Sequence, residues 1–180
     1  MEAAEVNVTK EGTQDHLPIA KTDWISCEFD MEWVNEDEDM GAAWIVKDEM
    51  GKVLDHSRRA FVSVKTREEA KLKLWLWVLE SMRNLKKKMI IFVSAFGDFV
   101  EAIKKPTLWP ALLFEASEIN RELEAFETWE LRIGSFAAVR CAFFIAQSVR
   151  RLGFHQSYVA AGHPRWLDHM YANERASSFR

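Results

Sequence analysis

Few cysteines, no long hydrophobic run and no excess of positive charge set the first limits on this chain of 180 residues. Its two cysteines, Cys27 and Cys141, provide no disulfide framework and favour a reducing compartment. No apolar run approaches the roughly 20 residues of a membrane-spanning helix, and no signal peptide opens the sequence. We therefore expect an intracellular protein, nuclear or cytoplasmic, without a membrane partner.

Basic residues are outnumbered, with 24 Lys and Arg against 28 Asp and Glu and a net charge of −4. This balance disfavours a strongly electrostatic nucleic-acid binder, because affinity for phosphate depends on clustered Lys and Arg. It leaves room for a local basic patch. Common catalytic motifs are also missing: there is no Walker loop, nucleophile elbow or Cys-x-x-Cys. His155, His163 and His169 have no cysteine nearby and no helical i, i+4 pair, so a zinc site is not expected.

What the chain does have is enough apolar material for a packed core. Hydrophobic residues make up 48% of it, with eight Trp and twelve Phe. A chain of this length forms one domain and buries roughly 70% of its unfolded surface. The sequence predicts a mobile polar leader at 1–21, a folded domain at 22–153, and a C-terminal tail at 154–180 that packs on the domain or extends from it.

Hydrophobic periodicity within the domain predicts the element order βββαβααβα. Three strands at 24–34, 41–47 and 52–62 form an antiparallel meander, with a turn at 48–51. Thr66 and Glu69 resemble a capping box that opens a helix reaching residue 85. A strand at 89–94, helices at 97–104 and 111–126, a strand at 128–133 and a helix at 136–152 follow. This order favours an α/β domain with a mixed five-stranded sheet and helices on its faces.

Several short segments follow one another in the order of these elements: Cys27-Glu28-Phe29-Asp30 with Trp33, Gly41-Ala42-Ala43-Trp44, Leu76-Trp77-Val78-Leu79, Ile91-Phe92-Val93-Ser94, Ile145-Ala146-Gln147-Ser148-Val149 and Pro164-Arg165-Trp166-Leu167. Together they resemble the ribonuclease H-like domains of plant non-LTR retroelements and their stand-alone crucifer relatives. The resemblance implies a ribonuclease H-like fold. It also implies the family's activity, cleavage of the RNA strand of an RNA–DNA hybrid by two Mg²⁺ ions.

The four metal-binding carboxylate positions of that family fall on Asp30, Lys71, Ala95 and Phe143. Only Asp30 is an acid. A Mg²⁺ ion needs several oxygen ligands around a small volume, and an ammonium at position 71 would repel it. We therefore expect no metal site and no cofactor, and a catalytically degenerate domain. We further expect Asp30 to form an ion pair with Lys71.

The resemblance then points to a binding or interaction module whose partner is nucleic acid, an RNA–DNA hybrid or RNA read by shape and backbone. Candidate phosphate contacts are Arg83, Lys86, Lys87 and Lys88, at the end of the first helix. Arg140, Arg150 and Arg151 are a second candidate strip. Trp109 and Trp166 are candidates for exposed contacts, whereas Trp44, Trp75 and Trp77 fall in apolar patterns that predict core packing.

Three alternatives stay open at this stage. The chain could be an active hybrid ribonuclease with a rearranged acid set, Asp30, Glu68 and Asp98. It could bind a protein and no nucleic acid, as its acidic charge favours. It could also be an expressed remnant with no selected role.

Overall fold

The computed structural model describes residues 22–168. The predicted leader at 1–21 lies outside the described residues, as do His169 and the rest of the tail from there on. The elements are β1 (Ile25–Glu32), β2 (Met40–Lys47), β3 (Val53–Phe61), α1 (Arg67–Asn84), β4 (Met89–Ser94), α2 (Gly97–Lys104), α3 (Leu113–Leu123), β5 (Thr128–Ile133), α4 (Arg140–Leu152) and β6 (Tyr158–Ala161). Short 3-10 turns at Pro106–Leu108, Pro110–Leu112 and Arg165–Leu167 complete the described part.

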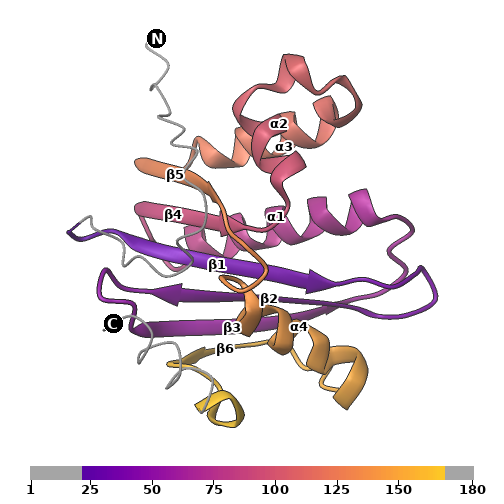
Figure 1. Ribbon diagram of the computed structural model, residues 1–180, viewed down its shortest axis with the longest axis vertical. Helices are drawn as coiled ribbons and strands as arrows, with labels where there is room; N and C mark the ends of the chain where they lie inside the picture. The colour runs from indigo at the N-terminus through magenta and orange to yellow at the C-terminus, as the bar shows by residue number, and fades with distance from the viewer. Residues whose placement is uncertain (1–21, 169–180) are drawn as a thin grey trace.

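One mixed sheet runs through the molecule in the order β5-β4-β1-β2-β3-β6 (Figure 1). Strands β1, β4 and β5 are parallel to one another, and β2, β3 and β6 extend the sheet by antiparallel pairing. Because parallel neighbours end at the same edge of a sheet, the carboxyl ends of β1, β4 and β5 meet at one place.

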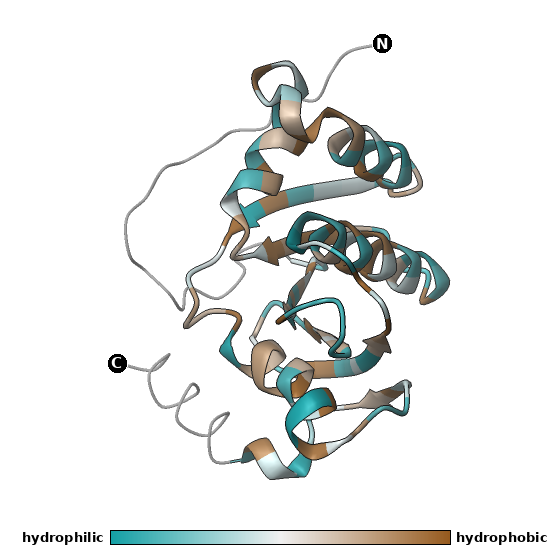
Figure 2. Cartoon of the chain, turned by 90° about the vertical axis from the view of Figure 1, so that its right-hand side faces the viewer, coloured by the Kyte–Doolittle hydropathy of each residue, from teal (hydrophilic) through white to brown (hydrophobic). Residues whose placement is uncertain are grey.

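Helices cover both faces of this sheet, and alternate residues of β2 show how. Ala42 and Trp44 face the larger core cluster, which includes Leu74 and Trp75 of α1. Ala43 lies between them in sequence and faces a smaller cluster built with α4. Because successive side chains of a strand point to opposite faces of the sheet, β2 contributes residues to both core clusters. Hydrophobic and hydrophilic residues also alternate along the helices (Figure 2), as expected of helices with one face on a sheet.

A glycine allows α4 to lie directly on β2. A Cβ atom at Gly41 would sit 1.9 Å from the carbonyl oxygen of Ala146 in α4. No side chain can occupy that space, so the backbones of strand and helix approach as closely as sterics allow. Gly41 pairs with Glu32 at the carboxyl end of β1, so this close approach places the middle of α4 beside that end of the strand.

The predicted class is confirmed: the chain is an α/β domain with a mixed sheet and helices on both faces. The predicted number of five strands is wrong, because Tyr158–Ala161 adds a sixth strand at the β3 edge. This strand is only four residues long and half of its side chains are exposed. Its sequence therefore has no hydrophobic pattern that would predict a strand. The last helix begins at Arg140, four residues later than the sequence indicates. Within residues 22–168, no helix is both long and apolar enough to cross a membrane.

Candidate functional site

A cleft of about 330 Å³ opens where the parallel strands end. It gathers residues from the end of β1, the turn after β4, the start of α1 and the region leading into α4. The lining residues are Asp30, Met31, Glu32, Trp33, Arg67, Ala95, Phe96, Phe136 and Phe143. Sites at the carboxyl ends of parallel strands are common in open α/β sheets, because loops and helix termini converge there.

Three of the four positions singled out from the sequence line this cleft. Asp30 belongs to β1, Ala95 follows β4, and Phe143 lies in the first turn of α4. They are far apart in the chain, and the parallel pairing of β1 with β4 brings the first two together. The phenyl ring of Phe143 packs on that of Phe136, with 5.3 Å between ring centroids. The fourth position, Lys71, does not line the cleft.

Asp30 is the most unusual group in the cleft. Its side chain lies on the α4 face of β1, and the residue is only 5% exposed. Burial raises the pKa of the Asp30 carboxyl to about 7, against the opposing effects of a hydrogen bond and of the Arg67 charge. The hydrogen bond comes from the Met31 amide, which donates to Asp30 Oδ1 at 2.8 Å. At neutral pH this buried carboxyl is therefore close to the midpoint of its titration.

The expected ion pair between Asp30 and Lys71 is wrong. The Lys71 ammonium instead donates to Asp98 Oδ2 at 2.9 Å, across the gap between α1 and α2. It also lies 5.0 Å from the centroid of the Phe96 ring. The cation that acts on Asp30 is Arg67, one helical turn before Lys71. Sequence analysis missed Arg67, and its only signal was its place beside the capping residue at the start of α1.

The donor set in the cleft does not fit a pair of Mg²⁺ ions. Its carboxylates are those of Asp30 and Glu32, and Glu32 Oε1 already accepts a hydrogen bond from Arg150. Elsewhere, Glu68 is exposed and Asp98 is held by Lys71, and neither lines the cleft. Nowhere in residues 22–168 do three or more His, Cys, Asp or Glu side chains form a group that could hold a metal ion.

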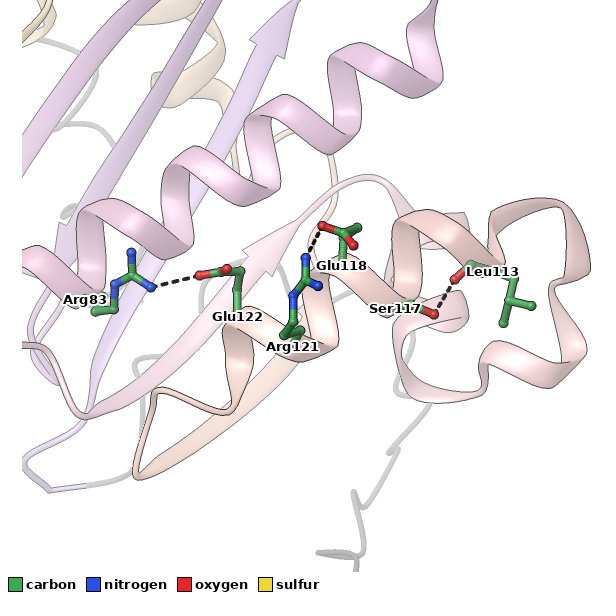
Figure 3. A network of polar contacts seen from close by, with 6 residues as sticks. All are labelled: Arg83, Leu113, Ser117, Glu118, Arg121 and Glu122. Atoms are coloured by element: carbon green, nitrogen blue, oxygen red, sulfur yellow. Dashed lines mark hydrogen bonds and ion pairs between the residues drawn. The ribbon is translucent and has the colours of Figure 1, made fainter.

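The candidate phosphate contacts at the end of α1 differ from one another. Arg83 donates to Glu122 Oε2 of α3 at 3.0 Å, within a row of polar contacts that also joins Arg121 to Glu118 (Figure 3). Its charge is therefore paired at the surface of the fold. Lys86 and Lys88 are exposed and Lys87 is half-buried. The positive potential at the end of α1 therefore comes mainly from these lysines.

The tryptophans divide into buried and exposed groups. Trp44, Trp75 and Trp77 are buried in the core, as their apolar patterns indicate. Trp109 is only partly exposed and packs against the same core, so its position between two prolines does not make it a free surface contact. Trp166 is 45% exposed. None of these five lines the cleft, where the tryptophan is Trp33.

Comparisons with solved structures agree with this architecture. The chain is similar to ribonuclease H1 from the halophilic archaeon Halobacterium salinarum NRC-1, with a TM-score of 0.61 and 13% identity over 69% of this chain and 96% of that one. It is similar to LC9-RNase H1, a type 1 ribonuclease H with the type 2 active-site motif, at a TM-score of 0.61 and 12% identity over 89% and 87% of the two chains. A foamy viral protease–reverse transcriptase solved with an RNA/DNA hybrid matches at a TM-score of 0.54 and 7% identity, over 80% of this chain and 22% of that one.

These likenesses define the fold: the chain has a ribonuclease H-like fold. No protein-family model matches the sequence, and no curated protein does. At identities of 7–13% a shared fold does not carry a shared activity. What this chain does must be argued from its own cleft.

Proposed function

We propose that this protein is a catalytically degenerate ribonuclease H-like domain that binds nucleic acid and does not cleave it. The main support is the content of the cleft. The family positions that line it hold one acid, a methyl group and a phenyl ring, at Asp30, Ala95 and Phe143. A two-metal mechanism places several oxygen ligands around the scissile phosphate, and this cleft offers aromatic carbon in their place.

The proposed ligand is an RNA–DNA hybrid or RNA. The foamy viral enzyme of similar fold was solved with an RNA/DNA hybrid, and LC11-RNase H1, another protein of similar fold, was also solved with one. In this chain the exposed ammonium groups of Lys86 and Lys88 and the guanidinium of Arg67 are available for phosphates. The further proposal that the domain derives from a plant non-LTR retroelement rests on the sequence resemblance alone.

Two assays on the intact chain test the proposal. In an Mg²⁺-dependent cleavage assay on an RNA–DNA hybrid, we expect the wild-type protein and Asp30→Asn to give the same background. Cleavage by the wild type that Asp30→Asn abolishes would show an active enzyme. In a binding assay on the same hybrid, we expect affinity to fall as salt rises, because phosphate contacts release counterions.

A protein partner is the second candidate. The net charge of −4 and the pairing of Arg83 with Glu122 favour it over a ligand held by electrostatics alone. The same binding assay separates the candidates. Absence of measurable affinity for hybrid, single-stranded RNA and double-stranded RNA at low salt would reject the nucleic-acid proposal in favour of this one.

A further inference from the structure

Two carboxyl oxygens in the cleft have no hydrogen bond from any described residue. Asp30 uses Oδ1 to accept from the Met31 amide, and nothing in residues 22–168 donates to its Oδ2. Glu32 uses Oε1 to accept from Arg150, and its Oε2 is buried and without a hydrogen bond. A buried acceptor without a donor is costly. Glu32 Oε2 is closed off from solvent, whereas Asp30 is 5% exposed and lines the cleft. Asp30 therefore marks the inner wall of the cleft as a place for a ligand that carries N–H donors.

The outer wall is aromatic and stays open to solvent. Phe136 is 59% exposed although its ring already packs on Phe143. Phe96 also lines the cleft, and the Arg67 guanidinium lies 5.7 Å from the centroid of its ring. The cleft thus combines three features: aromatic rings, a hydrogen-bond acceptor on Asp30, and the Arg67 cation at its rim.

We propose that the cleft takes a single unpaired nucleobase with an exocyclic amino group, such as adenine or cytosine. The base stacks on Phe136, its amino group donates to Asp30 Oδ2, and its phosphate contacts Arg67. This proposal rests on the proposed function and names the nucleic-acid element that is recognised. The cleft volume of about 330 Å³ lies at the lower end of the roughly 300–1,000 Å³ typical of small-molecule sites.

Other occupants fit the same groups less well. Uracil and thymine keep one ring donor, the N3–H, but two carbonyl oxygens flank it, and one of them would face the Asp30 acceptor. A cationic peptide side chain would meet the like charge of Arg67 at the rim. A phosphate alone would satisfy Arg67 but would be repelled by the buried carboxyls. An amino-bearing nucleotide satisfies the Asp30 acceptor, the aromatic rings and the Arg67 cation together.

The test is fluorescence anisotropy of labelled oligoadenylate, oligocytidylate and oligouridylate of equal length on the intact chain. At a pH of about 8.5, where the Asp30 carboxyl is ionised, we expect the adenine and cytosine strands to bind about tenfold more tightly than uridine strands, since one hydrogen bond to a charged acceptor is lost with uracil. The Asp30→Asn substitution replaces the free acceptor by an amide donor. It should remove this preference or reverse it toward uracil, which a merely structural role of Asp30 would not do.

Phe136→Ala tests the stacking surface. We expect about a tenfold loss of affinity for all three strands, because base–aromatic stacking is sequence-tolerant. The matched control is Phe114→Ala, since Phe114 is 65% exposed on α3 and lies outside the cleft. It should bind as the wild type does. Both phenylalanines are exposed, so both variants should fold, which circular dichroism verifies.

The outcomes distinguish failure of the base-binding cleft from failure of the proposed nucleic-acid binding. Oligonucleotide binding that shows no base preference and is unchanged in Phe136→Ala and Asp30→Asn would overturn the base-binding cleft and leave nucleic-acid binding intact. Absence of binding to every oligonucleotide and to the hybrid would overturn both.

Discussion

Two buried polar sites of this domain differ in how completely the protein satisfies them. At the seam between β3 and β6, the His56 ring bonds to the Gly162 carbonyl oxygen at 2.6 Å and to the Tyr158 hydroxyl at 3.1 Å. Ser57 there donates to the Tyr158 carbonyl. In the cleft, by contrast, Asp30 and Glu32 each leave a carboxyl oxygen without a hydrogen bond from the described residues.

These two hydrogen-bonding patterns indicate different roles for the two sites. Buried polar groups are normally hydrogen-bonded, because an unsatisfied one lowers stability. The seam follows that rule and fastens a short edge strand to the sheet. Asp30 departs from it in a cleft that opens to solvent, where a ligand could supply the missing donor. Residues that are poorly placed for stability often serve function, and this contrast makes the two sites respond differently to substitution and pH.

The largest expected effect concerns Asp30 and pH. Its folded-state pKa of about 7 lies above the ordinary 3.8, so between these values the folded chain binds the extra proton and loses stability as pH rises. Asp30→Asn removes this cost. We expect it to raise the free energy of unfolding by up to roughly 4 kcal/mol at about pH 8, and by little at about pH 4. Urea denaturation at both pH values measures the difference, and an equal effect at both would contradict the assignment.

The seam should show the opposite pH dependence. Burial lowers the pKa of His56 below its usual 6.5, so the unfolded chain binds the extra proton and stability falls as pH drops below about 6.5. His56→Leu should lose this slope. At neutral pH it should also cost about 1 kcal/mol, because it leaves the partly buried Gly162 carbonyl without a donor. A His56→Leu variant that keeps the wild-type slope in thermal denaturation would place the titrating group elsewhere.

A smaller effect is expected from Lys71, whose partner sits outside both sites. Lys71→Met leaves the Asp98 carboxylate unpaired, but the Asp98 side chain is 37% exposed and water can solvate it. We expect a loss of about 1 kcal/mol. Lys73→Met is the matched control on the same helix, because Lys73 is 40% exposed in a loose pair with Glu69 at 3.9 Å; its effect should be near zero.

A double-mutant cycle sharpens this prediction. Lys71→Met should couple to Asp98→Asn, since the two side chains touch, and should be nearly additive with Asp30→Asn. Strong coupling to Asp30→Asn would instead support the Asp30–Lys71 ion pair that the sequence predicted, against the Lys71–Asp98 pair of the structure.

The smallest expected effect lies at the end of α1. The Arg83 guanidinium is 49% exposed in its pair with Glu122, so Arg83→Gln should change the free energy of unfolding by less than about 0.5 kcal/mol. Its effect on hybrid affinity should be smaller than that of Lys86→Gln, because Lys86 is exposed and its ammonium is available for phosphate. Anisotropy with the labelled hybrid compares the two variants. A larger loss from Arg83→Gln would show that its pair with Glu122 opens on binding.

Much of this fold can be predicted from local signals. Hydrophobic periodicity placed β4 and α2 at the residues where they occur. The capping box was also visible: the Thr66 side chain accepts a hydrogen bond from the Glu69 amide at 3.1 Å. Such features depend on residues a few positions apart, so the sequence carries them directly.

The sequence by itself determined the order of elements, and the fold class follows from that order. It also determined that positions 71, 95 and 143 carry no carboxylate, because the side chain at each position is a fact of covalent structure. Only the tertiary structure decided that Lys71 bonds to Asp98, that Arg67 faces Asp30, and that β6 joins the sheet beside His56. The reason is physical: a charged side chain takes whichever partner the packing of distant elements brings within a few ångströms, and no local pattern encodes that distance.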